Sequence, residues 1–249
     1  VTLPGLGLEV GEPAINRVPR QMMIQELSSL YEGGLEVTVS VPGGRELAQR
    51  TFNPKLGIID GISIIGTSGI VRPFSSEAFV NAIRREVEVC KAVGCNHLVI
   101  NSGARSERFL KAEFPELPMQ AFVHFGNFIR ETLRIADEVG MEEVTLGIMI
   151  GKAVKLAEGH LDTHSKKVVM NKSFLKQVAV EAECSNDSRS VIDGLTLARE
   201  LWNLLSPDDA FRFFSKLIEK CYLHCRPLLP EGKLTIRLMD EEGRIFNQD

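Results

Sequence analysis

The sequence has no apolar run near the roughly 18 residues that a membrane-spanning helix needs. It also does not open with the charged, apolar and small-residue segments of a secretory leader. With 44% hydrophobic and 25% charged residues among 249, it has the composition of a globular protein. We therefore expect a cytoplasmic protein with no membrane partner. The first residue is Val1 rather than Met, which leaves open whether a native N-terminus precedes it.

A basic excess is absent too, because the formal net charge is −4. Nucleic-acid binders usually present a basic stripe to the phosphates, so we expect no nucleic-acid partner. The five cysteines form no paired C-x-x-C pattern, which indicates reduced thiols rather than disulfides or a structural metal site. Between Gly151 and Lys176, however, six lysines stand against Glu158 and Asp162. A solvated helix face and a basic binding surface are both typical of such a cluster.

The first 55 residues are interpreted as the remainder of an N-terminal α+β domain that looks truncated. Residues 1–34 are rich in glycine and proline around a short helical patch at 22–30, which predicts a turn-rich segment. Residues 35–41 alternate strictly between apolar and polar side chains, which predicts a half-buried strand. A short helix from Arg45 and a break at Asn53-Pro54 follow.

Beyond residue 55, apolar runs of strand length alternate with stretches of helical period, which is the pattern of an α/β fold. Buried strands are predicted at 57–65, 97–100 and 144–150, and an alternating strand at 234–239. Helices are predicted from Ser75 or Ser76 to Gly94, at 121–139, 168–183, 189–205 and 207–224. Continuous apolarity favours a mostly parallel sheet with helices on both faces. We therefore expect residues 56–249 to form an α/β ligand-binding domain.

The loops that follow the predicted strands are the candidate binding site, because ligands of open parallel sheets bind beyond the carboxyl ends of the strands. Each loop contains glycine, which lets a ligand approach the backbone, beside polar or cationic side chains. The candidate residues are Gly66, Thr67, Ser68, Gly69, Arg72, Asn101, Ser102, Gly103, Arg105, Gly151, Lys152 and Lys155, with Gly126 and Asn127 as a pocket wall. The alternative is that these turns need glycine only for their geometry.

None of three known catalytic motifs is matched in full. The Gly147–Lys152 stretch has three residues between its glycines, where a Walker A phosphate loop has four. His160 and His164 have the i, i+4 spacing of a zinc pair, but Gly159 favours a helix stop and the glutamate of H-E-x-x-H is missing, so no metal site is predicted. No G-x-S-x-G elbow is present. His124 is expected to pack or cap a helix.

Several segments together resemble one family. They are T2-L-P-G-L6, G11-E-P-A-I-N16, V18-P-R20, T51-F-N-P54, G61-I-S-I-I-G-T-S-G-I-V-R-P73 and G151-K-A-V-K-L-A-E-G-H-L-D-T-H164. In this order, over nearly the whole chain, they resemble the CbiD family, the cobalt-precorrin-5B C1-methyltransferases of anaerobic cobalamin biosynthesis. Family members usually begin with a further segment that contains a threonine- and alanine-rich motif, and this sequence lacks it.

The resemblance implies S-adenosylmethionine as the methyl donor and a cobalt tetrapyrrole as the acceptor, with cobalt present only as part of the substrate. Such a substrate carries many carboxylates, so we expect Lys152 and Lys155, in the first turns of a helix, to face them or the donor's carboxylate. His160 or His164 is the candidate general base on pKa grounds, unless both only cap or pack their turn. Which loop binds which ligand, and whether the protein forms a homo-oligomer or contacts neighbouring pathway enzymes, stays open.

Two other classes of function are also compatible with these residues. One is a non-catalytic corrinoid- or nucleotide-binding module, which would bind the donor without turnover. The other is a metal-dependent hydrolase that uses His160, Asp162 and His164, which would hold stoichiometric zinc.

Overall fold

The computed structural model describes residues 1–66, 75–164 and 170–246. The chain forms two compact units, Val1–Gly94 and Cys95–Asp249, and each is described by itself. The division falls after Gly94, whereas the sequence-based domains 1–55 and 56–249 divide the chain earlier and stay a prediction. Among the helices described, none is long and apolar enough to span a bilayer.

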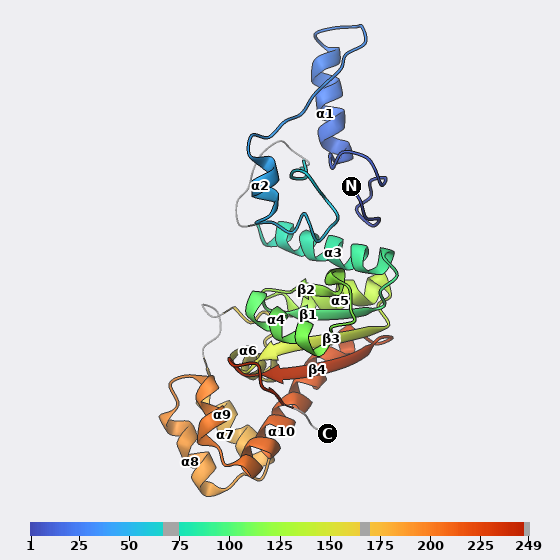
Figure 1. Ribbon diagram of the computed structural model, residues 1–249. Helices are drawn as coiled ribbons and strands as arrows, with labels where there is room; N and C mark the ends of the chain where they lie inside the picture. The colour runs from blue at the N-terminus through green and yellow to red at the C-terminus, as the bar shows by residue number, and fades with distance from the viewer. Residues whose placement is uncertain (67–74, 165–169, 247–249) are drawn as a thin grey trace. The chain divides into compact units, whose positions relative to one another are not determined.

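The first unit contains α1 (Arg17–Ser28), α2 (Gly44–Ala48) and α3 (Ser76–Ala92) (Figure 1). The predicted start of α3 is confirmed, because the Ser75 hydroxyl accepts a hydrogen bond from the Ala78 amide at 3.2 Å. The helix has a buried face that includes Ile83, Val87 and Cys90, whereas Phe79 is exposed.

Two predicted strands of this unit are wrong. Residues 35–41 form no strand, and the four apolar side chains at 35, 37, 39 and 41 are 38–52% exposed. Residues 57–65 are irregular apart from one bridge between Ile64 and Ile15, and Ile59 and Ile65 are exposed. A strand needs a neighbour to satisfy its backbone groups and a layer to cover its apolar face. In the described part of the chain, residues 35–41 pair with no strand, and residues 57–65 pair only through the bridge of Ile64 with Ile15.

The second unit is built on one sheet of β1 (His97–Asn101), β2 (Phe122–His124), β3 (Glu143–Met149), β4 (Lys233–Met239) and β5 (Ile245–Phe246). The order is β2-β1-β3-β4-β5. The first four strands are parallel and β5 is antiparallel to β4. The predicted, mostly parallel sheet is therefore confirmed, as are its strands at 97–100, 144–150 and 234–239.

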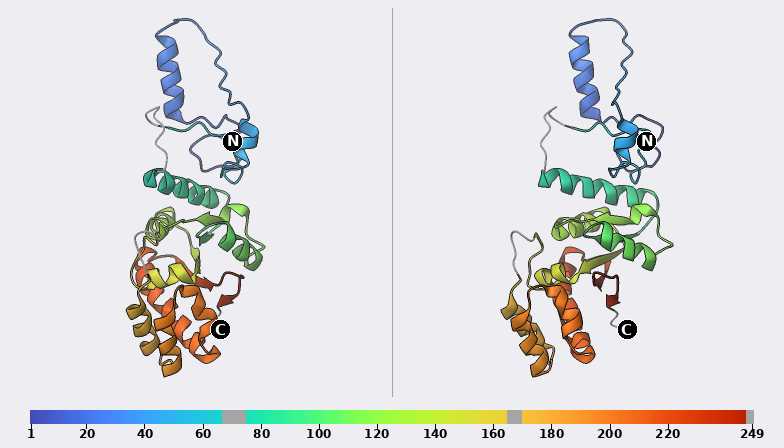
Figure 2. Two further views of the ribbon diagram at one scale, coloured as in Figure 1. Left: turned by 90° about the vertical axis from the view of Figure 1, so that its left-hand side faces the viewer. Right: turned by 60° about the vertical axis from the view of Figure 1, so that its left-hand side comes forward.

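Helices cover both faces of this sheet, as predicted. The helices of this unit are α4 (Ala104–Glu113), α5 (Ile129–Val139), α6 (Ile150–Ala157), α7 (Lys172–Glu181), α8 (Asn186–Gly194), α9 (Leu201–Leu204) and α10 (Pro207–Cys225), with 3-10 turns at Met119–Ala121, Ala198–Glu200 and Arg226–Leu228. Of these, α7, α8 and α9 lie beside α10 and away from the strands (Figure 1). Right-handed crossovers place α4 on one face and α5 on the other, as the left view of Figure 2 shows. The core between them includes Leu98, Ile100, Leu146 and Ile148, all fully buried.

Three helix predictions need correction. The helix predicted at 121–139 begins only at Ile129, because residues 122–124 pair with β1 as strand β2. It ends as predicted at Gly140, whose φ of 75° is left-handed. The helix predicted at 189–205 is interrupted after Gly194, and α4 was not predicted at all. Neighbouring strands and caps outweigh helical period in these short segments.

The strand order reverses at one point, between β1 and β3. From β1 the chain moves outward to β2, and it then returns past β1 to β3 and β4. The connections that leave β1 and β3 therefore lie on opposite faces. In sheets of this topology a crevice forms beyond the carboxyl ends of the two strands at such a point. This crevice is where a ligand of such a sheet is expected.

Candidate functional site

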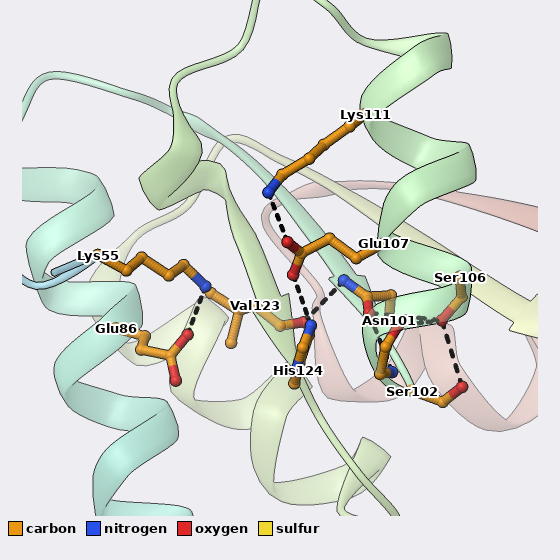
Figure 3. Close-up of polar contacts among 10 residues, drawn as sticks. Lys55, Glu86, Asn101, Ser102, Ser106, Glu107, Lys111, Val123 and His124 are labelled. Atoms are coloured by element: carbon orange, nitrogen blue, oxygen red, sulfur yellow. Dashed lines mark hydrogen bonds and ion pairs between the residues drawn. The ribbon is translucent and has the colours of Figure 1, made fainter. Parts of the chain in front are cut away.

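The turn after β1 is shaped by Asn101, the last residue of the strand, which is fully buried. Its Oδ1 atom accepts a hydrogen bond from the Gly103 amide at 3.0 Å, and its Nδ2 atom donates to the Val123 carbonyl at 3.4 Å (Figure 3). Gly103 has a φ of 155°, and a Cβ built there would meet no described atom within 4 Å. The backbone of this turn therefore faces open space, beside the Ser102 hydroxyl.

The α6 helix begins directly after β3, so Lys152 and Lys155 lie in its first turns as predicted. The ammonium group of Lys152 donates hydrogen bonds to the Gly126 carbonyl at 2.7 Å, the Asn127 Oδ1 atom at 2.6 Å and the Thr163 hydroxyl at 3.4 Å. All three acceptors are neutral. Lys152 thus joins α6 to the loop after β2 and to the loop after α6.

Burial, together with the neighbouring charge of Lys155, lowers the pKa of Lys152 to about 8, and Asp162 opposes the shift. Lys155 is half-buried, and among the described residues its Nζ atom donates one hydrogen bond, to the Thr163 carbonyl at 3.4 Å. The N-terminus of α6 adds partial positive charge at the same place. This part of the site therefore favours an anion.

The predicted catalytic histidines lie in the loop after α6 rather than on a helix. Gly159 follows the end of α6 with a φ of 103°, as its predicted role as a helix stop requires. The His160 side chain is 45% exposed, and its Nε2 atom lies 3.7 Å from the Glu158 carboxylate. The amide of His164 donates to the Asp162 carboxylate at 3.2 Å. In the described part of the chain, no group of three or more His, Cys, Asp and Glu side chains could hold a metal.

One charged cluster at this edge of the sheet was not predicted. His124, the last residue of β2, has its Nε2 atom 2.5 Å from the Glu107 carboxylate, whose other oxygen accepts from Lys111 at 2.5 Å (Figure 3). Burial raises the pKa of Glu107, but the hydrogen bonds from His124 and Lys111 outweigh it and lower this pKa to about 2. The i, i+4 spacing of Glu107 and Lys111 is a helical signal, but it is informative only once α4 is recognised.

The structure brings together most of the predicted site residues of the second unit at the carboxyl edge of the sheet. They are Asn101, Ser102 and Gly103 after β1, Gly126 and Asn127 after β2, and Gly151, Lys152 and Lys155 after β3. Arg105 is exposed, 3.9 Å from the Glu241 carboxylate. Gly66 belongs to the first unit, and Thr67, Ser68, Gly69 and Arg72 lie outside the described residues.

The chain is similar in sequence to known proteins along nearly its whole length. The family described as CbiD matches residues 1–73, and the family described as CbiD, C-terminal domain, matches residues 162–249. The cobalt-precorrin-5B C(1)-methyltransferase of Prosthecochloris aestuarii is 42% identical over 245 residues, covering 96% of this chain and 66% of the relative. The protein of the same name from Geobacillus kaustophilus is 41% identical, covering 95% and 64%. A third, from Variovorax paradoxus, is 38% identical, covering 98% and 69%.

The chain thus spans slightly less than two thirds of the length of the first two relatives. A solved structure described as cobalamin biosynthesis protein (cbiD) from Archaeoglobus fulgidus is 27% identical, covering 66% of this chain and 54% of that chain. Its TM-score is 0.26, a value too low for a comparison of folds.

Proposed function

Because the chain belongs to the CbiD family, we propose that it serves in the transfer of a methyl group from S-adenosylmethionine to ring carbon C1 of a cobalt-precorrin. The observation that supports this most is the 42% identity over 96% of the chain to a protein named for that reaction. The product in our proposal is cobalt-precorrin-6A, made from cobalt-precorrin-5B in anaerobic cobalamin biosynthesis. The chain spans about two thirds of the length of these relatives, so the complete methyl transfer is our proposal for this chain.

The chemistry asks mainly for positioning. The C–S bond of the sulfonium breaks as the new C–C bond forms, and both electrons of the broken bond stay on sulfur. Two bound partners held in line supply most of the rate gain in such a displacement. We propose that the crevice between β1 and β3 holds them, with the open turn at Gly103 and the loop at Gly151 in contact with the ligands.

The charges at the site suit a substrate with many carboxylates. Lys152, Lys155 and the N-terminus of α6 place positive charge at this edge in a chain whose net charge is −4. In our proposal the substrate's acetate and propionate groups, or the donor's carboxylate, bind there. Cobalt enters only as part of the substrate. We propose the cobalt tetrapyrrole as the binding partner. We also propose that the protein acts in the cytoplasm with the other enzymes of that synthesis.

Methyl transfer from a sulfonium adds a methyl cation, so a substrate that gains one methyl group in place of a hydrogen must release a proton. A base near the crevice would take it up. We propose His160 or His164 for this role, since both stand on the loop that Lys152 contacts through Thr163. Replacement of the responsible histidine by glutamine should lower the rate of transfer and leave ligand affinity nearly unchanged.

The test supplies this chain, and the full-length Prosthecochloris protein as a positive control, with S-adenosylmethionine and the cobalt tetrapyrrole. Mass spectrometry should show one added methyl group that depends on both ligands. If the control methylates while this chain binds both ligands and never transfers, the chain is a binding module. If the chain binds neither ligand although the control does, the crevice is not the site and the proposal fails.

A further inference from the structure

Lys152 and Lys155 differ in how much of their hydrogen-bonding capacity the protein uses. An ammonium group has three N–H donors. Those of Lys152 meet three oxygen atoms, on Gly126, Asn127 and Thr163. Lys155 donates to one oxygen only, the Thr163 carbonyl at 3.4 Å, among the described residues. A ligand carboxylate would therefore find donors on Lys155 and none to spare on Lys152.

The oxygen atoms around Lys152 belong to two loops. The Thr163 amide also donates to the Asn127 carbonyl at a long 3.4 Å, and Phe128 and Asp162 form a bridge. The Thr163 side chain is almost completely buried. The Lys152 ammonium contacts both loops with hydrogen bonds from a charged group, which are stronger than neutral ones.

The lysine itself is attached to a rigid element. The next two residues, Ala153 and Val154, are buried, and the Ala153 carbonyl accepts a hydrogen bond from the Cys221 thiol of α10 at 3.4 Å. A buried ammonium with neutral partners is costly, and an apolar side chain of similar length would fill the same space without that cost. Its presence here is explained if the loops need the charge.

We propose that Lys152 is a positioning residue that holds the loop 161–164 against the loop 126–128, and that Lys155 is the lysine that meets the ligand's carboxylate. The positioned loop contains Thr163 and His164, and His160 directly precedes it. We call the contact of Lys152 with these two loops the clamp, and it needs no ligand. The assignment of ligand binding to Lys155 and of loop positioning to Lys152, the division of roles, rests on the proposed function.

The clamp is tested by hydrogen–deuterium exchange on the protein without ligand. Lys152→Met should speed exchange of the 161–164 amides by about tenfold, the effect of losing a charged hydrogen bond of ordinary strength. Lys155→Met removes only the 3.4 Å hydrogen bond to the Thr163 carbonyl and should have a much smaller effect on these amides. Lys172→Met, at a half-buried lysine bonded to the Asp193 carbonyl, is the matched control and should leave them unchanged. Exchange of the loop within twofold of wild type in Lys152→Met, or equal loosening by Lys155→Met, overturns the clamp.

Two further variants keep the test decisive if Lys152→Met does not fold. Lys152→Arg retains the charge and several donors and should restore much of the protection. Asn127→Ala removes one acceptor only and should loosen the same amides to a lesser degree. If Asn127→Ala leaves the loop as protected as in wild type, the proposed clamp is wrong.

The division of roles is tested by turnover with the cobalt tetrapyrrole. Lys155→Met should raise KM with little change in kcat, because it removes binding that is equal in the ground and transition states. Lys152→Met should lower kcat, because the histidine loop is no longer held. The reverse assignment of the two effects overturns the division. If wild type shows no turnover, the proposed function fails while the exchange result still decides the clamp.

Discussion

Binding of a carboxylate ligand to this site should be coupled to uptake of a proton by Lys152. In the free protein, burial and the charge of Lys155 hold the pKa of Lys152 at about 8. A carboxylate that binds at Lys155 offsets that charge and adds an attraction, so it raises the pKa of Lys152 toward the ordinary lysine value. The ligand therefore prefers the protonated protein, and its affinity should fall as the pH rises above about 8.

The size of the effect follows from the fraction of Lys152 that is neutral before binding. With a free pKa of about 8, half of the sites are neutral at pH 8, about a tenth at pH 7 and about nine tenths at pH 9. If binding restores an ordinary pKa, proton uptake should approach these fractions. The affinity should then fall by up to about tenfold per pH unit between the free and the bound pKa.

Isothermal titration calorimetry in phosphate and in Tris at pH 8 measures the uptake, because the two buffers release protons with different heats. A corrinoid with free acetate and propionate side chains and no cobalt-bound water is a suitable ligand, since its carboxylates are fully ionised in this range. Uptake should vanish in Lys152→Met and persist in the Lys172→Met control. Equal binding heats in both buffers, or unchanged uptake in Lys152→Met, would refute the reasoning.

Two other predictions concern the elements that build the site. In urea denaturation, Gly147→Ala should cost about 1–3 kcal/mol, because its Cβ would overlap the Leu110 side chain of α4. Leu110→Ala removes a fully buried side chain and should cost less in the Gly147→Ala background than in wild type. Equal stability of Gly147→Ala and wild type would contradict this packing. The ion pairs of Glu107 with His124 and Lys111 should contribute stability that is present above pH 4.5 and is lost as the pH falls toward about 2, since the folded pKa lies below the ordinary one. Acid titrations of Glu107→Gln should lack this loss, and an acid transition like that of wild type would rule it out.

The elements predicted correctly are those whose own side chains identify them, such as strands with a continuous run of apolar residues. The strands β1, β3 and β4 are such runs, and the short connection from β3 into α6 could be read from the glycine and lysines that follow. Since parallel strands have their carboxyl ends at one edge, the loops of Gly103 and Gly151 could be expected at the same site. The cap of α3 at Ser75 was equally local.

The wrong predictions concern segments whose secondary structure depends on residues far away in the sequence. Residues 35–41 have the alternation of a strand, but alternation specifies a face and supplies no pairing partner. Residues 122–124 became a strand because β1 pairs with them, although three residues are too few to show a period of two. The hydrogen bonds of Lys152 to Gly126 and Asn127 could not be predicted either. These residues approach Lys152 only once α5 and β3 are in place.

The charges around the crevice explain why its positive side is available to a ligand. Glu107 is bound by His124 and Lys111. Asp240, which follows β4, is buried and accepts hydrogen bonds from the Glu242 amide at 2.9 Å, and from the Arg244 amide at 2.8 Å and Nε atom at 2.5 Å. Both carboxylates are thus occupied by protein partners.

The lysines of α6 differ from these two carboxylates in the partners that surround them. Burial and the charge of Lys155 lower the pKa of Lys152 more than Asp162 raises it, and the acceptors around the Lys152 ammonium are neutral. Two positive charges held in this way beside a helix N-terminus are stabilised when an anion arrives. A substrate with several carboxylates supplies that anion, so the same charges that make the empty site unfavourable would orient the ring against the crevice.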